Sequence, residues 1–378
     1  MNKMKDPNIK KLDVYIHDQK VGTLAQMKNG LTAFQYDPVW LAEGFSISPF
    51  SLPLDNRVFV PKRYETFDGL FGVFADSLPD GWGRLVTDRW LRRQGLDPDR
   101  ITSLTRLALI GSAGKGALSY RPVIEMDDQI HAMALDDLAR EAVKLFDDDK
   151  SEHLDELLQY AGSSGGARPK ANIEMNQEKW IVKFPSRTLR EEDGVMEYDY
   201  SQCARACGLD IPETRLLPSE QCAGYFAVKR FDQQPGWKKH MLSLSALLET
   251  SHRIPNLDYE IIFKAAAHLT RDSRELEKLY RLTCFNVFAH NRDDHSRNFA
   301  FLYDENRKAW QLSPAYDLTY SNSFGGEHAT TVMGNGKNPG RKELLELAKK
   351  AGLKKRAAES IVNEIENTVK EMLSGYLK

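Results

Sequence analysis

Cysteine is scarce in this 378-residue chain, which has only Cys203, Cys207, Cys222 and Cys284. All four lie in segments that also read as hydrophobic core, and a chain of this length can bury a core without disulfide bonds. We therefore expect free thiols and a reducing, cytoplasmic setting. For Cys203 and Cys207, four apart on an expected helix, two small buried side chains are favoured over half of a metal site, because no second Cys/His pair has zinc-like spacing.

Long hydrophobic runs and an excess of one charge are also absent. No stretch approaches the roughly 18–20 apolar residues of a membrane-spanning helix, and the first residues lack the apolar segment of a secretion signal. The formal net charge is −2, so the overall balance does not direct the chain to nucleic acid or an anionic membrane. A composition of 41% hydrophobic and 28% charged residues is that of an ordinary globular protein, and the length favours two or three domains.

The segment from Asp293 to Asp317 carries the clearest chemical pattern. Asp293 is followed five residues later by Asn298, then by an apolar run (299–303), a turn, a second run (309–312) and Asp317. Protein kinases have the same order of parts: a base and a metal-binding Asn at D-x-x-x-x-N spacing, then a hairpin that leads to a metal-binding Asp. We therefore predict that Asp293 accepts a hydroxyl proton and that Asn298 and Asp317 bind Mg²⁺.

Other interpretations of this segment stay open. One alternative is a polar loop without chemistry. Another is part of a metal-dependent hydrolase, for which His290, Asp293, Asp294 and His295 would be four possible ligands. No second carboxylate or histidine cluster completes a two-metal site. Asp294 also competes with Asp293 as the base, and only the five-residue count to Asn298 favours Asp293.

A small-residue loop (162–170) lies upstream and is followed by an expected hairpin whose second strand (180–184) contains Lys183. Glycines lack a Cβ, so their backbone can approach phosphate closely, and a strand lysine can neutralise phosphate charge. Each piece alone is more simply a connector or a surface lysine. Together with the Asp293 segment they indicate the phosphate-binding half of a kinase.

A helix is expected at 197–207 and ends at Gly208. In a kinase, a glutamate from this region orients the strand lysine. Glu197 is the first candidate, Glu191 and Glu192 are rivals, and a solvated acidic first turn is equally open.

The strand 224–228 leads into Lys229–Asp232, the expected strap between two kinase lobes. Adenine would pair there with the backbone and pack on Phe231. After residue 241 helical periodicity dominates, and one helix leads into 290–293, so that the candidate residues follow a rigid helix end.

Three domains are expected: 1–125, rich in short strands; 126–235, a mixed N-lobe; and 236–378, a mainly helical C-lobe. The first should hold a hairpin at 12–24, helices near 69–76 and at 82–94, and a glycine-containing loop (113–120) for which a nucleotide role is not favoured. The boundary is placed in the acidic stretch 126–150, which includes a short helix at 135–146. Near the C-terminus, two amphipathic helices are favoured over a DNA-binding helix-turn-helix, because acidic residues on the second would repel phosphate.

The chain resembles the HipA-like serine/threonine kinases, the toxin components of bacterial toxin–antitoxin pairs. The resemblance rests on these motifs: L-P-D-G-W-G-R (78–84), G-A-L (116–118), S-x-G-G-A-R-P-K (163–170), V-K-F-P (182–185), V-K-R-F-D (228–232), D-D-H-S-R-N (293–298) and S-P-A-Y-D-L (313–318). It implies an α+β fold with a two-lobed kinase-like core and an N-terminal β-rich subdomain.

The resemblance also implies a role for each matching residue. Asp293 is the expected catalytic base, and Asn298 and Asp317 are the expected metal ligands. The nucleotide-binding residues implied are Ser163, Ser164, Gly165, Gly166, Ala167, Lys183, Lys229, Phe231, His295 and Tyr316. His295 is also expected to brace the loop, and Arg297 to hold the transferred phosphate or a nearby carboxylate.

Function follows from the same resemblance: an ATP- and Mg²⁺-dependent kinase that phosphorylates a translation component such as an aminoacyl-tRNA synthetase. Ser163 matches the serine that the family autophosphorylates, and Ser164 is a possible second site; phosphoserine would compete with ATP phosphates for the same loop. The expected partner is a helix-turn-helix antitoxin, and the chain is expected to contact DNA only indirectly, through this antitoxin. Lys229 stands where the family often has Glu, which favours backbone contacts to adenine. The alternative is a kinase-shaped binding module that seats an antitoxin on operator DNA with little catalysis.

Overall fold

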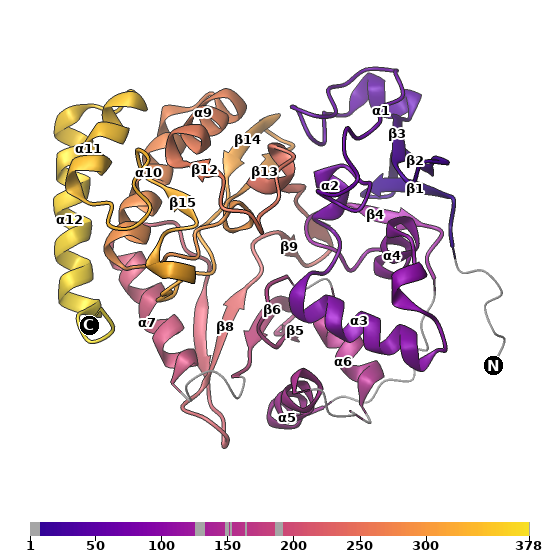
Figure 1. The fold of residues 1–378 in the computed structure, drawn as a ribbon, viewed down its shortest axis with the longest axis horizontal. Helices are drawn as coiled ribbons and strands as arrows, with labels where there is room; N and C mark the ends of the chain where they lie inside the picture. The colour runs from indigo at the N-terminus through magenta and orange to yellow at the C-terminus, as the bar shows by residue number, and fades with distance from the viewer. Residues whose placement is uncertain are drawn as a thin grey trace. The chain divides into compact units, whose positions relative to one another are not determined.

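The computed structural model describes residues 8–124, 133–147, 151, 153–162, 165–185 and 192–377. The chain forms two compact units (Figure 1). Unit 1 contains Met1–Glu191, Leu217–Leu242 and Ala246–Thr250, and unit 2 contains Glu192–Leu216, Ser243–Ser245 and Ser251–Lys378. The predicted three-domain division stays a prediction.

Unit 1 begins with a four-stranded antiparallel sheet in the order β3-β2-β1-β4. Its strands are β1 (Lys11–Ile16), β2 (Gln19–Gln26), β3 (Thr32–Tyr36) and β4 (Ser119–Arg121). The predicted hairpin is confirmed: His17 and Asp18 both have positive φ, as the tight turns that join twisted antiparallel strands require. Alternate β1 residues are buried, so one face of the strand belongs to the core.

Four helices of unit 1 lie between β3 and β4 of this sheet, and α5 (Leu135–Phe146) and α6 (Leu154–Ala161) lead from β4 to a second sheet. The first four are α1 (Pro38–Glu43), α2 (Gly72–Ala75), α3 (Gly81–Arg93) and α4 (Ser103–Ile110). The predictions at 82–94 and 135–146 are confirmed, whereas the helix expected near 69–76 is a single turn.

The second sheet of unit 1 contains β5 (Lys170–Met175), β6 (Glu178–Lys183) and β8 (Tyr225–Lys229), paired antiparallel in that order. The predicted hairpin is confirmed, with positive φ at Asn176 and Gln177. Short strands β9 (Gln233–Gln234) and β10 (Trp237–Lys238) follow.

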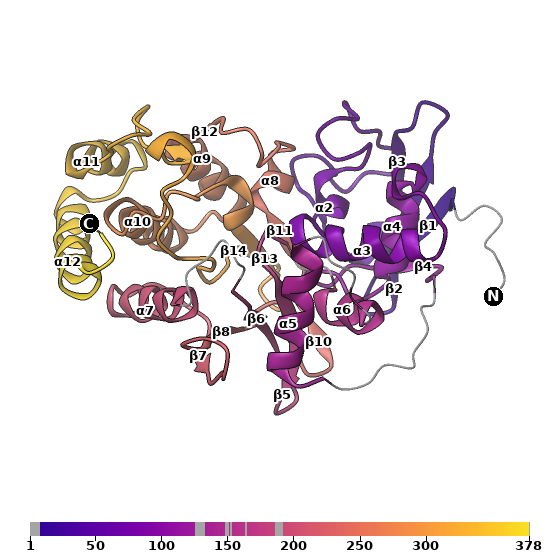
Figure 2. The ribbon, with the colours of Figure 1, turned by 60° about the horizontal axis from the view of Figure 1, so that its bottom comes forward.

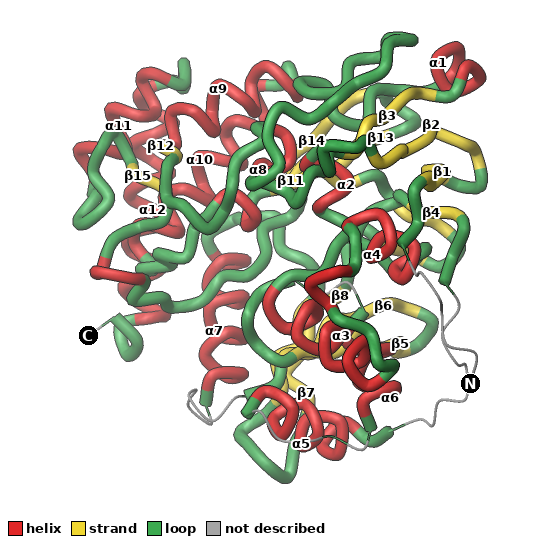
Figure 3. The backbone as a smooth tube through the Cα atoms, turned by 45° about the vertical axis from the view of Figure 1, so that its right-hand side comes forward, coloured by secondary structure: helices red, strands yellow, loops and turns green. Residues whose placement is uncertain are grey.

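One hydrophobic core joins this second sheet to α3, α5 and α6. Trp82, Val86 and Trp90 of α3 pack there with Trp180 and Val182 of β6. Figure 3 shows α3 and α6 beside the β5–β6 hairpin.

Unit 2 is mainly helical, as predicted for the later part of the chain. Its helices are α7 (Asp193–Ala206), α9 (Tyr259–Thr270), α10 (Ser273–Phe288), α11 (Arg341–Lys350) and α12 (Lys355–Leu373), and its strands are β12 (Leu257–Asp258), β13 (Ala300–Asp304), β14 (Ala309–Leu312) and β15 (Thr330–Thr331). The elements β7 (Thr214–Leu217), β11 (Met241–Ser243) and α8 (Leu244–Leu247) lie where the chain passes between units. Pairing of β13 with β14 confirms the predicted hairpin.

The C-terminal helices are packing elements of unit 2. α12 contacts both α10 and α7 (Figure 2), and it buries Ile361, Val362, Ile365 and Val369. This confirms the prediction of two amphipathic helices. Gly208 follows α7 with φ +71 and closes its last turn, as predicted. Among the helices of the described residues, none is long and apolar enough to cross a membrane.

Candidate functional site

The segment that carries Asp293 follows directly from the end of α10. Asp272 begins this helix by accepting a hydrogen bond from the Arg274 N–H at 2.9 Å, which satisfies a donor that the first turn leaves open. At the other end His290 has φ +52, and the Asn291 N–H donates to the Asn286 carbonyl at 3.0 Å. The chain therefore leaves a rigid helix just before Asp293.

Asp294 is wholly buried and anchors this segment to the strand β15. Its carboxylate accepts hydrogen bonds from the Tyr259 hydroxyl at 2.8 Å, from His328 Nδ1 at 2.9 Å and from the Thr330 N–H at 3.1 Å. Burial and the nearby Asp294 charge raise the pKa of Tyr259 well above its ordinary value, so its hydroxyl stays a donor. We name Tyr259, Asp294, His328 and Thr330 the Asp294 clamp.

The clamp distinguishes the two neighbouring aspartates. The Asp293 side chain is 59% exposed and lies 3.9 Å from His295 Nε2, while Asp294 has no exposed surface. His295 in turn packs edge-to-face on His252 at 5.4 Å between ring centroids, in line with its predicted bracing role. Asp293 thus has the access that a base needs, and Asp294 has a structural role.

Asn298 is held in one orientation by its own loop. Its Nδ2 donates to the Asp293 carbonyl at 2.7 Å, and the Asn298 N–H donates to the His295 carbonyl at 2.8 Å. Because the amide nitrogen is engaged by the backbone, the amide oxygen is directed away from it, as a metal ligand requires.

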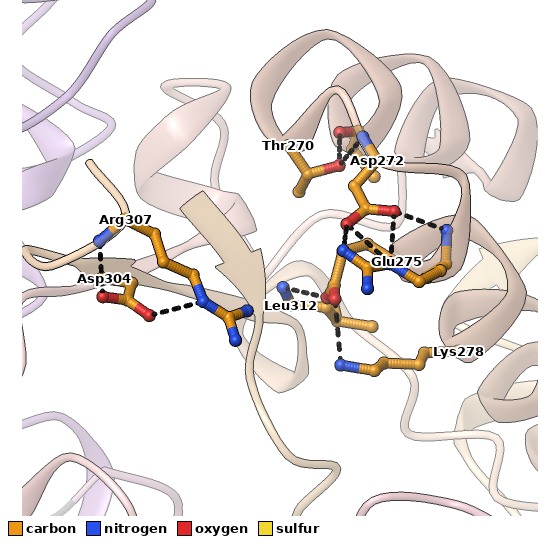
Figure 4. Close-up of polar contacts among 9 residues, drawn as sticks. Thr270, Asp272, Glu275, Lys278, Asp304, Arg307 and Leu312 are labelled. Atoms are coloured by element: carbon orange, nitrogen blue, oxygen red, sulfur yellow. Dashed lines mark hydrogen bonds and ion pairs between the residues drawn. The ribbon is translucent and has the colours of Figure 1, made fainter. Parts of the chain in front are cut away.

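The second acidic segment is fixed by the β13–β14 hairpin and by α10. Glu275 is buried at the start of α10 and accepts a hydrogen bond from the Leu312 N–H at 2.7 Å. It also forms an ion pair with Lys278 Nζ at 2.9 Å (Figure 4). Asp304 accepts backbone N–H groups in the hairpin turn. The end of β14 therefore has a set position, from which the chain continues to Asp317.

Tyr316, which directly precedes Asp317, contacts the Asp293 segment. The Tyr316 hydroxyl donates to the Arg297 carbonyl at 2.6 Å, and the Ala315 N–H donates to the Asp210 carbonyl at 2.7 Å. Asp317 has φ +58, a left-handed backbone that costs a non-glycine residue on the order of 1 kcal/mol and is often kept at functional sites. Unit 2 thus brings the segments of Asp293, Asn298 and Asp317 together.

Glu197 lies on α7 with only 2% of its surface exposed. α7 is joined to the end of α10 because the Tyr200 hydroxyl donates to the Ala289 carbonyl at 2.8 Å. The assignment of Glu197 as partner of Lys183 stays a prediction. Of its rivals, Glu191 lies outside the described residues and Glu192 directly precedes α7.

Unit 1 holds the glycine-loop residues. Gly165, Gly166 and Ala167 precede β5, whereas Ser163 and Ser164 lie outside the described residues. Lys170, at the start of β5, donates from Nζ to the Gly165 carbonyl at 2.5 Å. It stands directly opposite Lys183 of β6, and like charges at such positions repel unless an anion lies near. Lys183 Nζ also lies 5.7 Å from the Phe226 ring centroid.

The strap after β8 is bound to the N-terminal part of unit 1. Lys229 forms an ion pair with Glu178, so its side chain is engaged by a neighbouring strand and the predicted backbone contact to adenine remains the simpler one. On either side of Phe231, Arg230 and Asp232 form a buried ion pair of 2.7 Å. Asp232 also accepts the Gly116 N–H at 2.8 Å. Burial alone would raise the pKa of Asp232, but the Arg230 charge and these hydrogen bonds hold it below its ordinary value.

The chemistry of the predicted ligands suits magnesium, and their role stays a prediction. No group of three or more His, Cys, Asp or Glu side chains gathers around a possible metal position in the described part of the chain, and Asp294 is occupied by its clamp. One carboxylate and one amide oxygen, from Asp317 and Asn298, match the few protein ligands that Mg²⁺ takes beside phosphate oxygens and waters.

Two family models match most of the chain. The model described as the HipA N-terminal domain covers residues 12–121, and that of the HipA-like C-terminal domain covers residues 162–373. The chain belongs to the HipA family. The HipA N-terminal domain therefore includes α3 and β4, and the HipA-like C-terminal domain includes the glycine loop and all three acidic and amide candidates.

Two relatives and a solved structure are similar to most of this HipA-family chain. "Putative kinase Y4dM" of Sinorhizobium fredii is 25% identical over 346 residues, which are 82% of this chain and 77% of that protein. "Putative kinase Y4mE" of the same organism is 25% identical over 351 residues, with the same coverage. The Shewanella oneidensis MR-1 HipA, solved in a complex with HipB and operator DNA, superposes with a TM-score of 0.72 at 17% identity, over 96% of this chain and 90% of that one. The predicted kinase-like α+β fold is confirmed.

Several residues that organise the site were not predicted. His328, Thr330 and Tyr259 reach Asp294 from distant parts of the sequence, and no local spacing connects them. Asp80 of the HipA N-terminal domain accepts the Gly166 N–H at 2.5 Å. In the sequence Asp80 belongs to the L-P-D-G-W-G-R motif (78–84), and nothing in that motif indicates a contact with the glycine loop.

Proposed function

We propose that this HipA-family protein is an ATP- and Mg²⁺-dependent serine/threonine kinase that acts as the toxin of a toxin–antitoxin pair. The observation that carries the proposal is the contrast in unit 2 between exposed Asp293 and clamped Asp294, with Asn298 oriented by the Asp293 carbonyl. Family membership and relatives named as kinases support the same reaction class.

Each residue of the Asp293 segment has a distinct task in this proposal. Asp293 accepts the proton of the attacking hydroxyl, which requires an accessible carboxylate. Mg²⁺, held by Asn298 and Asp317, supplies charge neutralisation to the phosphates. The Asp294 clamp and the Tyr316–Arg297 hydrogen bond keep these side chains in a fixed arrangement, so little reorganisation is needed when substrate arrives.

Phosphate binding is assigned to unit 1. The backbone N–H groups of the glycine loop and Lys183 meet the phosphates, and the positive charge of opposed Lys170 and Lys183 supports an anionic ligand there. Phe231 and the backbone of the strap are assigned to adenine. Ser163, with Ser164 as a second site, is the proposed autophosphorylated residue.

The macromolecular partners follow from the family. We propose a translation component, such as an aminoacyl-tRNA synthetase, as the phosphorylated protein, and the cytoplasm as the place of action. The HipA–HipB–operator complex of the Shewanella protein, whose fold this chain shares, supports a helix-turn-helix antitoxin as the partner that connects the chain to DNA.

The test is self-labelling of the purified protein with γ-labelled ATP and Mg²⁺. Wild type should acquire label at Ser163 or Ser164, as located by peptide mass mapping. Asp293→Asn, which keeps the side-chain size, should lose at least about a hundredfold in rate, since general base catalysis is worth roughly 10²–10⁴.

Glu305→Gln, in the turn of the β13–β14 hairpin, is the charge-matched control and should label normally. Wild-type protein that neither binds ATP–Mg²⁺ nor labels itself would refute the proposal. In that case the kinase-shaped binding module becomes the better account.

A further inference from the structure

The HipA N-terminal domain contacts the glycine loop closely at two glycines, Gly81 and Gly166. The Trp82 N–H donates to the Gly166 carbonyl at 2.9 Å, and Trp82 Nε1 donates to the Lys170 carbonyl at 2.9 Å. A Cβ on Gly81 would collide with the Gly166 carbonyl oxygen. The L-P-D-G-W-G motif therefore contacts the glycine loop backbone to backbone, which only glycine permits.

Asp80 places a carboxylate on the loop itself. It is the residue before α3, yet its side chain makes no capping hydrogen bond to that helix. Instead Asp80 Oδ1 accepts the Gly166 N–H at 2.5 Å. A glycine-loop N–H is the kind of donor that holds phosphate oxygens in nucleotide-binding proteins, so Asp80 sits where an anionic ligand would be bound.

Two lysines reach the same backbone, and a third stands on the neighbouring strand. Lys170 Nζ bonds to the Gly165 carbonyl, and Lys183 stands opposite Lys170 across the β5–β6 pair. Lys115 approaches from the HipA N-terminal domain: a Cβ on Gly165 would lie 2.6 Å from Lys115 Nζ and 3.0 Å from Asp80 Oδ1. Lys115 and Asp80 thus meet at the loop with opposite charges.

We propose that the HipA N-terminal domain sets the phosphate affinity of the glycine loop, with Asp80 as an internal competitor for the Gly166 N–H and Lys115 as an additional phosphate-binding cation. This inference rests on the proposed nucleotide site and adds two residues to it from outside the kinase-like domain. Phosphate must displace the Asp80 carboxylate from the Gly166 N–H, because two anions that share one N–H donor repel each other strongly. Lys115 is then left to pair with phosphate.

The proposal makes opposite predictions for two substitutions in one contact. Asp80→Asn keeps a side chain of the same size that can still accept a hydrogen bond, but it removes the competing charge. Lys115→Gln removes the cation. Binding of Mg²⁺ with β,γ-imido-ATP to the full chain, measured by calorimetry, should be about tenfold tighter for Asp80→Asn and about tenfold weaker for Lys115→Gln, the size expected for one charge-assisted hydrogen bond.

Adenosine separates a phosphate effect from a general loosening of the loop. Because adenosine has no phosphate, its affinity should stay the same in both variants. Asp18→Asn and Lys20→Gln, in the β1–β2 hairpin, change the net charge by the same amounts and should alter neither ligand.

Each other result has a defined meaning. Weaker or unchanged imido-ATP binding by Asp80→Asn, or equal changes for both ligands, overturns the inference while leaving the kinase assignment intact. Wild-type protein that binds adenosine but no imido-ATP, or neither ligand, overturns the proposed function and this inference together.

Discussion

Asp293 and Asp294 are chemically identical neighbours that the fold uses in different ways. The Asp294 carboxylate receives three hydrogen bonds in a buried setting, where an ionised group is stable only when it is fully partnered. Asp293 keeps most of its side-chain surface exposed. The two carboxylates therefore differ in accessibility, and Asp293 is the one that meets the access required of the proposed base.

Asp294→Asn should lower the free energy of unfolding of the protein by about 3 kcal/mol. The amide has one acceptor where three donors converge, and its own NH₂ group faces those donors, so buried hydrogen bonds are lost. Denaturant unfolding followed by circular dichroism measures the change. His328→Ala removes one of the donors and should destabilise the protein in the same direction.

Asp293→Asn is the natural control, because it makes the same chemical change one residue earlier. It should leave the unfolding free energy within about 0.5 kcal/mol of wild type. If the two asparagine variants had equal stability, the Asp294 clamp would not be a structural anchor.

At single residues, sequence spacing predicts contacts only within one short segment. The five-residue count from Asp293 to Asn298 identified two side chains that one short loop holds together. No such count connects Asp294 with His328 or Asp80 with Gly166, since these contacts arise from the tertiary fold. The pairing of Lys229 with Glu178 needed the register of β6 and β8 to be known.

Among helices and strands, local chemistry made most boundaries predictable. The hairpin turns at His17–Asp18 and Asn176–Gln177 join alternating strands, and the periodicity of α10 and α12 marks their buried faces. α2 is shorter than expected because its sequence, rich in buried residues, is stabilised by the surrounding core and not by helix periodicity. The contact of α3 with the glycine loop has no local signature.

Gly81→Ala should be more destabilising than Gly95→Ala, although Gly81 begins α3 and Gly95 lies just beyond its other end. Both have positive φ, which costs alanine about 1 kcal/mol. A Cβ on Gly95 meets nothing within 4 Å, while one on Gly81 collides with the Gly166 carbonyl. We expect about 1 kcal/mol for Gly95→Ala and at least about 2 kcal/mol more for Gly81→Ala, measured by denaturant unfolding.

Nucleotide affinity gives a second comparison for the same pair. Gly81→Ala should also weaken binding of imido-ATP, because the glycine loop has to shift, and Gly95→Ala should leave it unchanged. Equal losses of stability in the two variants would contradict the close contact between α3 and the loop.

For the molecule as a whole, the half-buried carboxyl of Glu249 contributes to a dependence of stability on pH. Glu249 accepts the Gly72 N–H at 3.0 and 3.2 Å, and burial raises its pKa from 4.5 to about 7. The folded protein therefore binds a proton more tightly than the unfolded chain does. The stabilisation is complete below pH 4.5 and is lost as the pH rises towards 7.

Glu249→Gln should flatten this dependence. The amide keeps an oxygen for the Gly72 N–H and has no proton to lose, so the wild-type free energy of unfolding should fall relative to the variant by up to about 1.4 kcal/mol per pH unit between pH 4.5 and 7. Chemical unfolding at several pH values measures the difference. Glu65→Gln, at an exposed position, is the control, and a slope that Glu249→Gln leaves unchanged would refute the assignment.

At this scale the sequence predicted the class of fold and the order of its parts, but not how the parts share their cores. Composition shifts in the acidic stretch at 126–150 suggested a boundary there. Yet α5, within that stretch, contributes Leu138 and Leu145 to the core of unit 1. Burial of this kind depends on three-dimensional packing, which a change in composition does not reveal.

The core that α3 shares with β6 has a practical consequence for anyone dissecting the protein. A fragment cut at the end of the HipA N-terminal domain match, residue 121, would retain Trp82 and Trp90 and lose Trp180 and Val182, against which they are buried. Two indole rings would then face solvent and favour aggregation. This core is divided between the two matched segments, so expression should keep both of them in a single polypeptide.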